Sequence, residues 1–281
     1  MKKKIFALLL AATMSFALVA CGTENQASTE GSSSEVSTEA SSDAASSEES
    51  SVEESTATES SATESSATEN SAEPEQAVMS YAEYAAAQVD DPVVIEAYVQ
   101  ANQSWWDGKI TVYAQDKDGA YFLYNMACAS QEEADKLTKG TKIRVSGFKA
   151  EWEGEVEIAD STYEIVAGDS FIAEPVDVTE LLGTDALIEK QNQLVAFTGM
   201  TVESEALYKW DGSGSEGDDL YFNVSVNGNT YTFTVESYLC GADTEVYQAV
   251  KNLKKGDVVD LEGFLYWYQG VNPHITSCVV K

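Results

Sequence analysis

Histidine and arginine are almost absent from this 281-residue chain, which contains one of each, His274 and Arg144. A single histidine excludes a metal site built from several imidazoles. The 16 lysines and arginines stand against 48 acidic residues, which gives a formal net charge of -32. Proteins that clamp nucleic acid place many basic side chains on its phosphates. The charge therefore predicts that nucleic acid is disfavoured as a partner.

Motifs of nucleophilic and metal chemistry are missing as well. Ser213 and Ser215 lie in a glycine-rich segment without the Gly-x-Ser-x-Gly spacing of a hydrolase nucleophile. Neither this segment nor the Asp/Gly segment at 116–119 has the ligand spacing of an EF-hand, so we expect turns there, with a weak cation site as the alternative.

Four acids alternate along one predicted hairpin, which could suggest a glycosidase-like carboxylate pair. They are Glu151, Glu153, Glu155 and Glu157. Acids with a period of two along a strand are expected on its solvated face. We therefore expect no enzyme activity, no cofactor and no metal.

The longest apolar run, Ile5 to Ala20, follows three lysines at the N-terminus. A basic start and a short apolar run are typical of a secretory signal peptide, and the run is too short to persist as a membrane span. The run ends in Leu-Val-Ala-Cys-Gly at 18–22, which resembles the lipobox of bacterial lipoproteins. The resemblance implies that the signal peptide 1–20 is removed and that Cys21 is lipidated.

Lipidation of Cys21 would have a clear physical effect, since several acyl chains together give stable anchoring in a lipid bilayer. The expected location is the extracytoplasmic face of the cell membrane. A soluble secreted protein in which Cys21 is incidental is the alternative.

Residues 21–76 read as a disordered stalk. Between 22 and 76 the chain has 14 acids, no lysine or arginine, and 24 serines and threonines. Such a segment has too little apolar surface to offset its ordering entropy, and as a flexible coil it spans on the order of 40 Å. Its hydroxyls are alternatively sites of O-glycosylation.

The composition changes after residue 76, where all five tryptophans and all 14 tyrosines lie. An internal repeat divides this part into two units, 77–168 and 169–281. The segment 137–148 matches 253–264 in a Gly-x-x-[IV]-x-[VL]-x-Gly pattern, and Ile95 matches Phe197 in the strand that opens each unit.

The residue patterns of both units predict the same order of elements: a helix, a strand, a hairpin, a second helix and a second hairpin. In the second hairpin Asn227-Gly228 has the residues of a tight type I′ turn. The expected ranges are 79–88, 93–99, 110–115, 120–126, a helix capped by Ser130, 142–149 and 156–166 in the first unit, and 179–190, 194–202, 222–226, 231–235, a helix opened by Asp243 or Thr244, 257–267 and 274–280 in the second.

This order resembles the OB-fold, a five-stranded Greek-key barrel with a helix between its third and fourth strands. The resemblance implies an all-β fold with short helices, in which two tandem barrels follow the stalk. A pair of small β-sandwiches is the alternative. Cys128 and Cys240 occupy equivalent positions and are expected to be buried apolar residues, while a Cys240–Cys278 disulfide stays open.

OB-folds commonly bind ligands on their second and third strands, between the loop joining strands one and two and the loop joining strands four and five. Both loops carry aromatic residues in both units, and rigid rings stack on sugars, bases and peptide side chains. The candidate ligand-binding residues are Trp105, Trp106, Trp152, Tyr208, Trp210, Tyr266, Trp267, Tyr268 and His274.

We therefore predict two binding modules for an oligosaccharide, a peptide or a protein partner, displayed by a membrane-anchored lipoprotein. Two other functions remain open: binding of single-stranded nucleic acid, by analogy with the fold, and a structural adaptor that docks to another surface protein. The rings alternatively close the barrel ends as part of the core.

Overall fold

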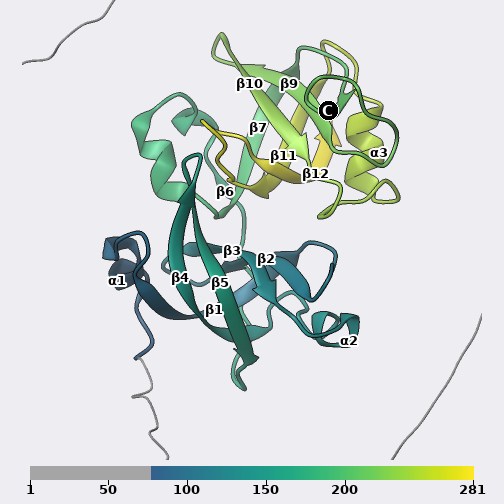
Figure 1. The fold of residues 1–281 in the computed structure, drawn as a ribbon. Coiled ribbons are helices and arrows are strands. Elements are labelled where there is room, and N and C mark those ends of the chain that lie inside the picture. The colour runs from purple at the N-terminus through teal and green to yellow at the C-terminus, as the bar shows by residue number, and fades with distance from the viewer. Residues whose placement is uncertain (1–76) are drawn as a thin grey trace, which may run out of the picture. The chain divides into compact units, whose positions relative to one another are not determined.

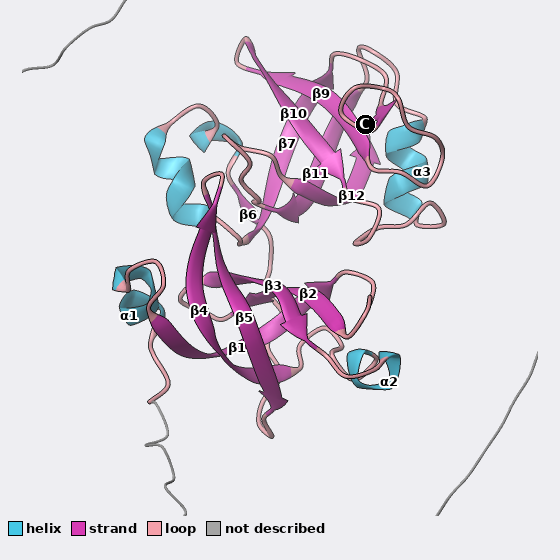
Figure 2. Cartoon of the chain, viewed as in Figure 1, coloured by secondary structure: helices cyan, strands magenta, loops and turns pink. Residues whose placement is uncertain are grey.

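The computed structural model describes residues 77–281. The predicted signal peptide, Cys21 and the stalk at 21–76 lie outside the described residues. Figures 1 and 2 show two β-barrels with short helices at their edges. In the part of the chain that is described, no helix is long and apolar enough to cross a membrane.

The first barrel closes in the strand order β1-β2-β3-β5-β4, with β4 paired to β1. The closing β3–β5 contact is parallel, and the other neighbours are antiparallel. Its elements are α1 (Tyr81–Ala86), β1 (Pro92–Asn102), β2 (Lys109–Gln115), β3 (Ala120–Ala127), α2 (Gln131–Ala134), β4 (Lys142–Trp152) and β5 (Glu155–Ile165).

The second barrel repeats this order as β7-β9-β10-β12-β11, again with a parallel contact between its third and fifth strands. The closed rings confirm the OB-fold prediction and show that the β-sandwich alternative was wrong. The elements of the second unit are β6 (Val176–Asp177), η1 (Thr179–Leu181), η2 (Asp185–Lys190), β7 (Leu194–Val202), β8 (Leu207–Tyr208), β9 (Leu220–Val226), β10 (Asn229–Val235), α3 (Glu245–Lys251), β11 (Val258–Phe264) and β12 (His274–Val280).

The repeated apolar positions meet inside each barrel. Ile95 of β1 pairs with Val145 of β4, and Phe197 of β7 pairs with Leu261 of β11. All four side chains are buried in the cores of their barrels. The matched positions of the sequence repeat therefore occupy the same place in the two barrels.

The two tight hairpins of the second and third strands differ in their turns. Asn227 and Gly228 both have positive φ, 51° and 81°, as the type I′ prediction requires. Gly119, at the matching turn of the first barrel, does not need a positive φ. Its hydrogen lies against the ring of Tyr81, so that a Cβ at this position would overlap that ring.

The helical segment predicted at 179–190 is present, but as two short 3-10 helices, η1 and η2, separated by Gly183 with a φ of +80°. A left-handed residue at this position ends a helix, so no continuous α-helix can form across it. The cap predicted at Ser130 is present, since its hydroxyl accepts a hydrogen bond from the Glu133 amide, but α2 comprises only four residues.

The three cysteines of the described region are free. Cys128 and Cys240 are buried, as expected for small apolar residues, and Cys278 is half-buried. The disulfide left open between Cys240 and Cys278 is therefore not formed in this structure.

Lys149 of β4 is a buried lysine that caps helix α1, with only 8% of its surface exposed. Its Nζ donates hydrogen bonds to the carbonyls of Tyr84, Ala85 and Ala87 at 3.1, 2.9 and 2.8 Å. These carbonyls lie at the C-terminal end of α1, where the helix leaves acceptors unsatisfied and favours a positive charge. Lys149 therefore ties the N-terminal helix to the barrel.

We expect Lys149→Met to destabilise the protein by about 2 kcal/mol, because it leaves carbonyl groups buried without donors. Urea unfolding of the variant measures this cost. Lys139→Met, which changes an exposed lysine, is the matched control and should leave the midpoint unchanged. Equal midpoints for the two variants would contradict the capping role.

Candidate ligand-binding site

The face of the first barrel where OB-folds bind ligands is covered by the second barrel. Tyr113 of β2 and Phe122 of β3 are buried in a cluster with Ala173, Leu194 and Phe264. The rings of Tyr113 and Phe264 stack with centroids 4.2 Å apart and an angle of 11°. The part of this face around Tyr113 and Phe122 therefore serves as a docking surface inside the chain and is covered.

His274 belongs to the same junction. Its Nδ1 lies 2.7 Å from the hydroxyl of Tyr113, and its ring stacks on Tyr266 with centroids 4.3 Å apart. The side chain is 9% exposed, and burial lowers the pKa of the imidazole to about 3. His274 is therefore neutral at physiological pH.

The tip of the β4–β5 hairpin also docks on the second barrel. The Glu155 carboxylate accepts a hydrogen bond from the amide of Trp267 at 2.8 Å, and the Glu153 carbonyl accepts one from the amide of Gln269 at 2.7 Å. Gly154, between them, has a φ of +93° and lies against the Trp267 ring, where a Cβ would come within 2.9 Å of a ring carbon. A glycine is therefore required at the tip.

The expectation that the alternating acids lie on a solvated face was wrong for two of the four. Glu151 and Glu153 are exposed, whereas Glu155 is fully buried and Glu157 nearly so. The reason is the docking of the second barrel on this end of the hairpin. Burial raises the pKa of Glu155 to about 8 against the opposing effect of the Trp267 amide, and its Oε1 has no hydrogen-bond partner among the described residues.

The buried Glu155 carboxyl predicts a loss of stability as the pH rises. Its pKa in the unfolded chain is about 4.3, so between about pH 4.3 and 8 the folded protein holds a proton that the unfolded chain releases. The resulting loss is on the order of 5 kcal/mol and is complete above pH 8.

We expect Glu155→Gln, which resembles the protonated carboxyl, to match the wild type near pH 4 and to exceed its stability at pH 9. Denaturant unfolding at several pH values measures the difference. Glu151→Gln, on the exposed part of the same hairpin, should leave the pH profile unchanged. A profile for Glu155→Gln that runs parallel to that of the wild type would contradict the buried carboxyl.

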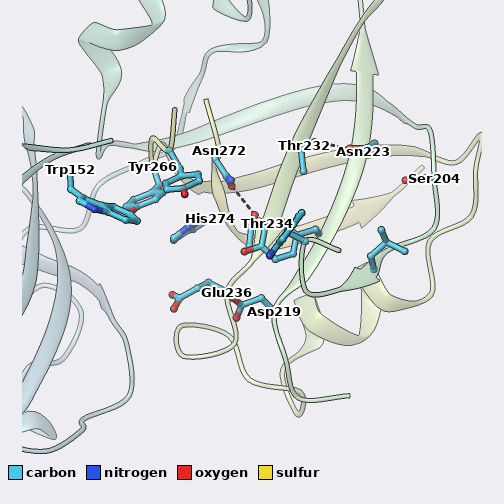
Figure 3. Close-up of a pocket in the computed structure, with 14 residues that line it drawn as sticks. Trp152, Ser204, Asp219, Asn223, Thr232, Thr234, Glu236, Tyr266, Asn272 and His274 are labelled. Atoms are coloured by element: carbon cyan, nitrogen blue, oxygen red, sulfur yellow. Dashed lines mark hydrogen bonds between the residues drawn. The ribbon is translucent and has the colours of Figure 1, made fainter. Parts of the chain in front are cut away.

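The corresponding face of the second barrel is open and forms a cleft of about 660 Å³ (Figure 3). Strands β9 and β10 form its floor, and the β7–β9 and β11–β12 connections form its walls. Trp152, from the β4–β5 hairpin of the first barrel, also lines it. The lining residues are Trp152, Ser204, Leu207, Trp210, Asp219, Tyr221, Asn223, Thr232, Thr234, Glu236, Tyr266, Tyr268, Asn272 and His274.

The floor carries hydroxyl and amide groups that are fixed by hydrogen bonds. Thr232 donates to Asn223 Oδ1 at 2.8 Å, across the paired strands, and Thr234 donates to Asn272 Oδ1 at 2.7 Å (Figure 3). Polar groups that are fixed in this way orient a bound ligand and make its binding specific. None of the residues that line the cleft is a lysine or an arginine.

Aromatic rings stand at the rim. Trp210 is 77% exposed, and Trp152 and Tyr268 are exposed as well, with ring centroids 5.2 Å apart. Large exposed rings are uncommon on a soluble surface without a function, and they offer rigid contact area with few rotors to fix. The rim and the floor together suit a ligand that has both flat faces and hydroxyl or amino groups.

The structure brings five of the nine candidate residues together around this cleft, namely Trp152, Trp210, Tyr266, Tyr268 and His274. The other four lie elsewhere. Trp105 is half-buried and donates its indole N–H to the Cys128 carbonyl at 2.9 Å, while Tyr208 and Trp267 pack against the second core. Trp106 is 76% exposed and lines a smaller cavity of about 230 Å³ with Tyr238.

Seven polar and acidic residues of the cleft, together with Leu207 and Tyr221, were not among the candidates. The seven are Ser204, Asp219, Asn223, Thr232, Thr234, Glu236 and Asn272. The alternation of polar and apolar residues along 220–236 was a usable signal, since the polar members of both strands face the same side.

The described residues include no group of three or more histidines, cysteines and acids that could hold a metal ion.

No protein-family model and no curated protein sequence matches the chain. Among solved structures it is similar to a murine DNA-binding protein bound with double-stranded DNA, at 12% identity and a TM-score of 0.34 over 68% of this chain and 96% of the other. The HINa domain of Ifi202 in complex with double-stranded DNA shows 14% identity and a TM-score of 0.30 over 69% and 96%.

A replication protein A heterotrimer bound to single-stranded DNA is also similar, at 13% identity and a TM-score of 0.30, over 69% of this chain and 49% of the other. These complexes correct the expectation that nucleic acid is disfavoured as a partner. That expectation rested on the excess of acids over lysine and arginine, in the whole chain and after residue 76, whereas binding depends on the groups at the binding face. Net charge is therefore not a ground for excluding nucleic acid.

Proposed function

We propose that this protein is a lipid-anchored, extracytoplasmic binding protein whose second OB barrel holds an oligosaccharide in the cleft over β9 and β10. The observation that supports this most is the open cleft of about 660 Å³ on the face where OB-folds bind ligands. The proposed function is binding without catalysis. The first barrel contributes to the site through its β4–β5 hairpin, which supplies Trp152. Its own Tyr113 and Phe122 are buried against the second barrel.

An oligosaccharide fits the cleft in two respects. Sugar rings present flat C–H faces that pack on aromatic side chains, which here are Trp152, Trp210 and Tyr268 at the rim. Sugar hydroxyls both donate and accept hydrogen bonds. The floor offers Asn223 and threonine hydroxyls as partners, and the wall offers Asn272.

Replacing Trp210 tests the site, because Trp106 provides a matched control. The two indoles are equally exposed, at 77% and 76%, but only Trp210 lines the cleft. On an array of immobilised oligosaccharides we expect Trp210→Ala in the whole chain to weaken binding about tenfold, since a stacked ring contributes about 1 kcal/mol or more. Trp106→Ala should bind like the wild type. Equal losses for both variants would contradict the site.

Single-stranded nucleic acid is the second candidate ligand, favoured by the exposed rings at the rim, since bases stack on aromatic side chains as readily as sugars do. An immobilised oligothymidine strand on the same array separates the two ligands. Binding of that strand that weakens steeply with salt and is lost in Trp210→Ala, without binding of any oligosaccharide, would favour nucleic acid.

If Cys21 is the lipid anchor, its replacement should change where the protein is found in the cell. Cys21→Ala removes the lipidated thiol, so we expect the variant to leave the membrane fraction, because the acyl chains supply the membrane affinity. Fractionation of cells followed by detection of the protein measures this. Cys278→Ala is the control and should stay with the membrane. Retention of Cys21→Ala in the membrane fraction would contradict lipid anchoring.

A further inference from the structure

Two carboxyl groups lie next to one another in the cleft, at the side away from Asn223 and Thr232 (Figure 3). Asp219 precedes β9 and Glu236 follows β10, so the pairing of the two strands brings them together. No lysine or arginine lines the cleft with them. Carboxylates that are withdrawn from water are ordinarily paired with a cation or hydrogen-bonded on both oxygens.

Each carboxyl is held in place through one oxygen. Asp219 Oδ1 accepts from the amide and the hydroxyl of Ser237 at 2.8 and 2.7 Å, and Glu236 Oε2 accepts from Gln103 Nε2 at 2.8 Å. Among the described residues no hydrogen bond reaches Asp219 Oδ2 or Glu236 Oε1. The two groups are thus oriented, and each has an acceptor left for a ligand.

His274 provides a separate observation on the same cleft. Its ring is nine-tenths buried and lines the cavity, and its Nδ1 is engaged by the Tyr113 hydroxyl. Its Nε2 has no hydrogen-bond partner among the described residues. Because burial holds the pKa of this imidazole near 3, the ring carries no positive charge that could neutralise the two acids.

We propose that the cleft recognises an oligosaccharide that bears a free amino group, with the ammonium seated between Asp219 and Glu236 and the sugar rings on the aromatic rim. An ammonium has three N–H donors and no acceptor, so it matches the two open carboxylate oxygens. The ring of Tyr221 lines the same cleft. This inference rests on the proposed function.

The electrostatics of the cleft agree with this assignment. Burial and the charge of Asp219 raise the pKa of Glu236 to about 8, against the effect of the Gln103 hydrogen bond. The charge of Asp219 therefore disfavours the ionised form of Glu236. An ammonium at this position would favour the ionised form, because an opposite charge within a few ångströms stabilises it.

A pair of trisaccharides with the same sugar rings, one with free amino groups and one with acetylated amino groups, tests the inference. Titration calorimetry with the full chain at neutral pH compares the trimer of glucosamine with the trimer of N-acetylglucosamine. We expect the glucosamine trimer to bind at least tenfold more tightly. The variants Asp219→Asn and Glu236→Gln should each reduce this preference severalfold. Both variants are nearly isosteric, and a circular dichroism spectrum and an unfolding midpoint equal to those of the wild type report that they are folded.

The outcomes separate the inference from the proposed function. Equal affinity for the two trimers, or a preference that persists in both variants, would overturn the ammonium site and leave the oligosaccharide cleft standing. A lysine-containing tripeptide that binds when neither trimer does would overturn the sugar as the carrier of the ammonium. An oligothymidine strand that binds in place of all three would overturn the proposed function as well.

Discussion

The stacking of Tyr113 on Phe264, with the Tyr113 hydroxyl on His274, is the contact on which the rest of the structure depends. It joins the ligand face of one OB barrel to the β11–β12 side of the other, and it removes that face from water. A buried aromatic pair gains both from burial and from ring geometry, so it is a strong point of attachment. In this arrangement Tyr113 of β2 and Phe122 of β3 are covered in the first barrel, whereas the equivalent strands of the second barrel, β9 and β10, form the floor of the open cleft.

The same docking explains the unusual acids. Glu155 is fully buried because the hairpin tip meets the loop that contains Trp267, and Glu236 is partly withdrawn because Gln103 of the first barrel reaches it. Burial raises the pKa of both carboxyls, against the opposing effect of the hydrogen bonds from the Trp267 amide and from Gln103. The first barrel thus shapes the second barrel's cleft by supplying Trp152 to its wall and by orienting one of its acids.

Much of the fold could be predicted from the sequence, because the repeat of glycines and apolar residues shows which strands correspond, and Asn227-Gly228 identifies a hairpin turn. The 3-10 turns at 179–190 could not, since the left-handed Gly183 interrupts an otherwise helical pattern. For the site, the aromatic loops indicated the binding side of the barrels. The burial of Glu155 and the position of Trp152 depend on how the barrels dock, which local patterns do not encode. Whole-chain charge, likewise, was a poor guide to the binding face.

The central claim is that a ligand binds in the cleft of the second barrel and not on the first barrel. Hydrogen–deuterium exchange of the full chain, with and without the glucosamine trimer, tests this most directly. The account predicts slower exchange in the segments 204–210, 220–236 and 266–274 and at the hairpin tip around Trp152, with no change around Trp106 and Tyr238. Protection confined to the Trp106 and Tyr238 region, with the β9–β10 segments unaffected, would contradict it.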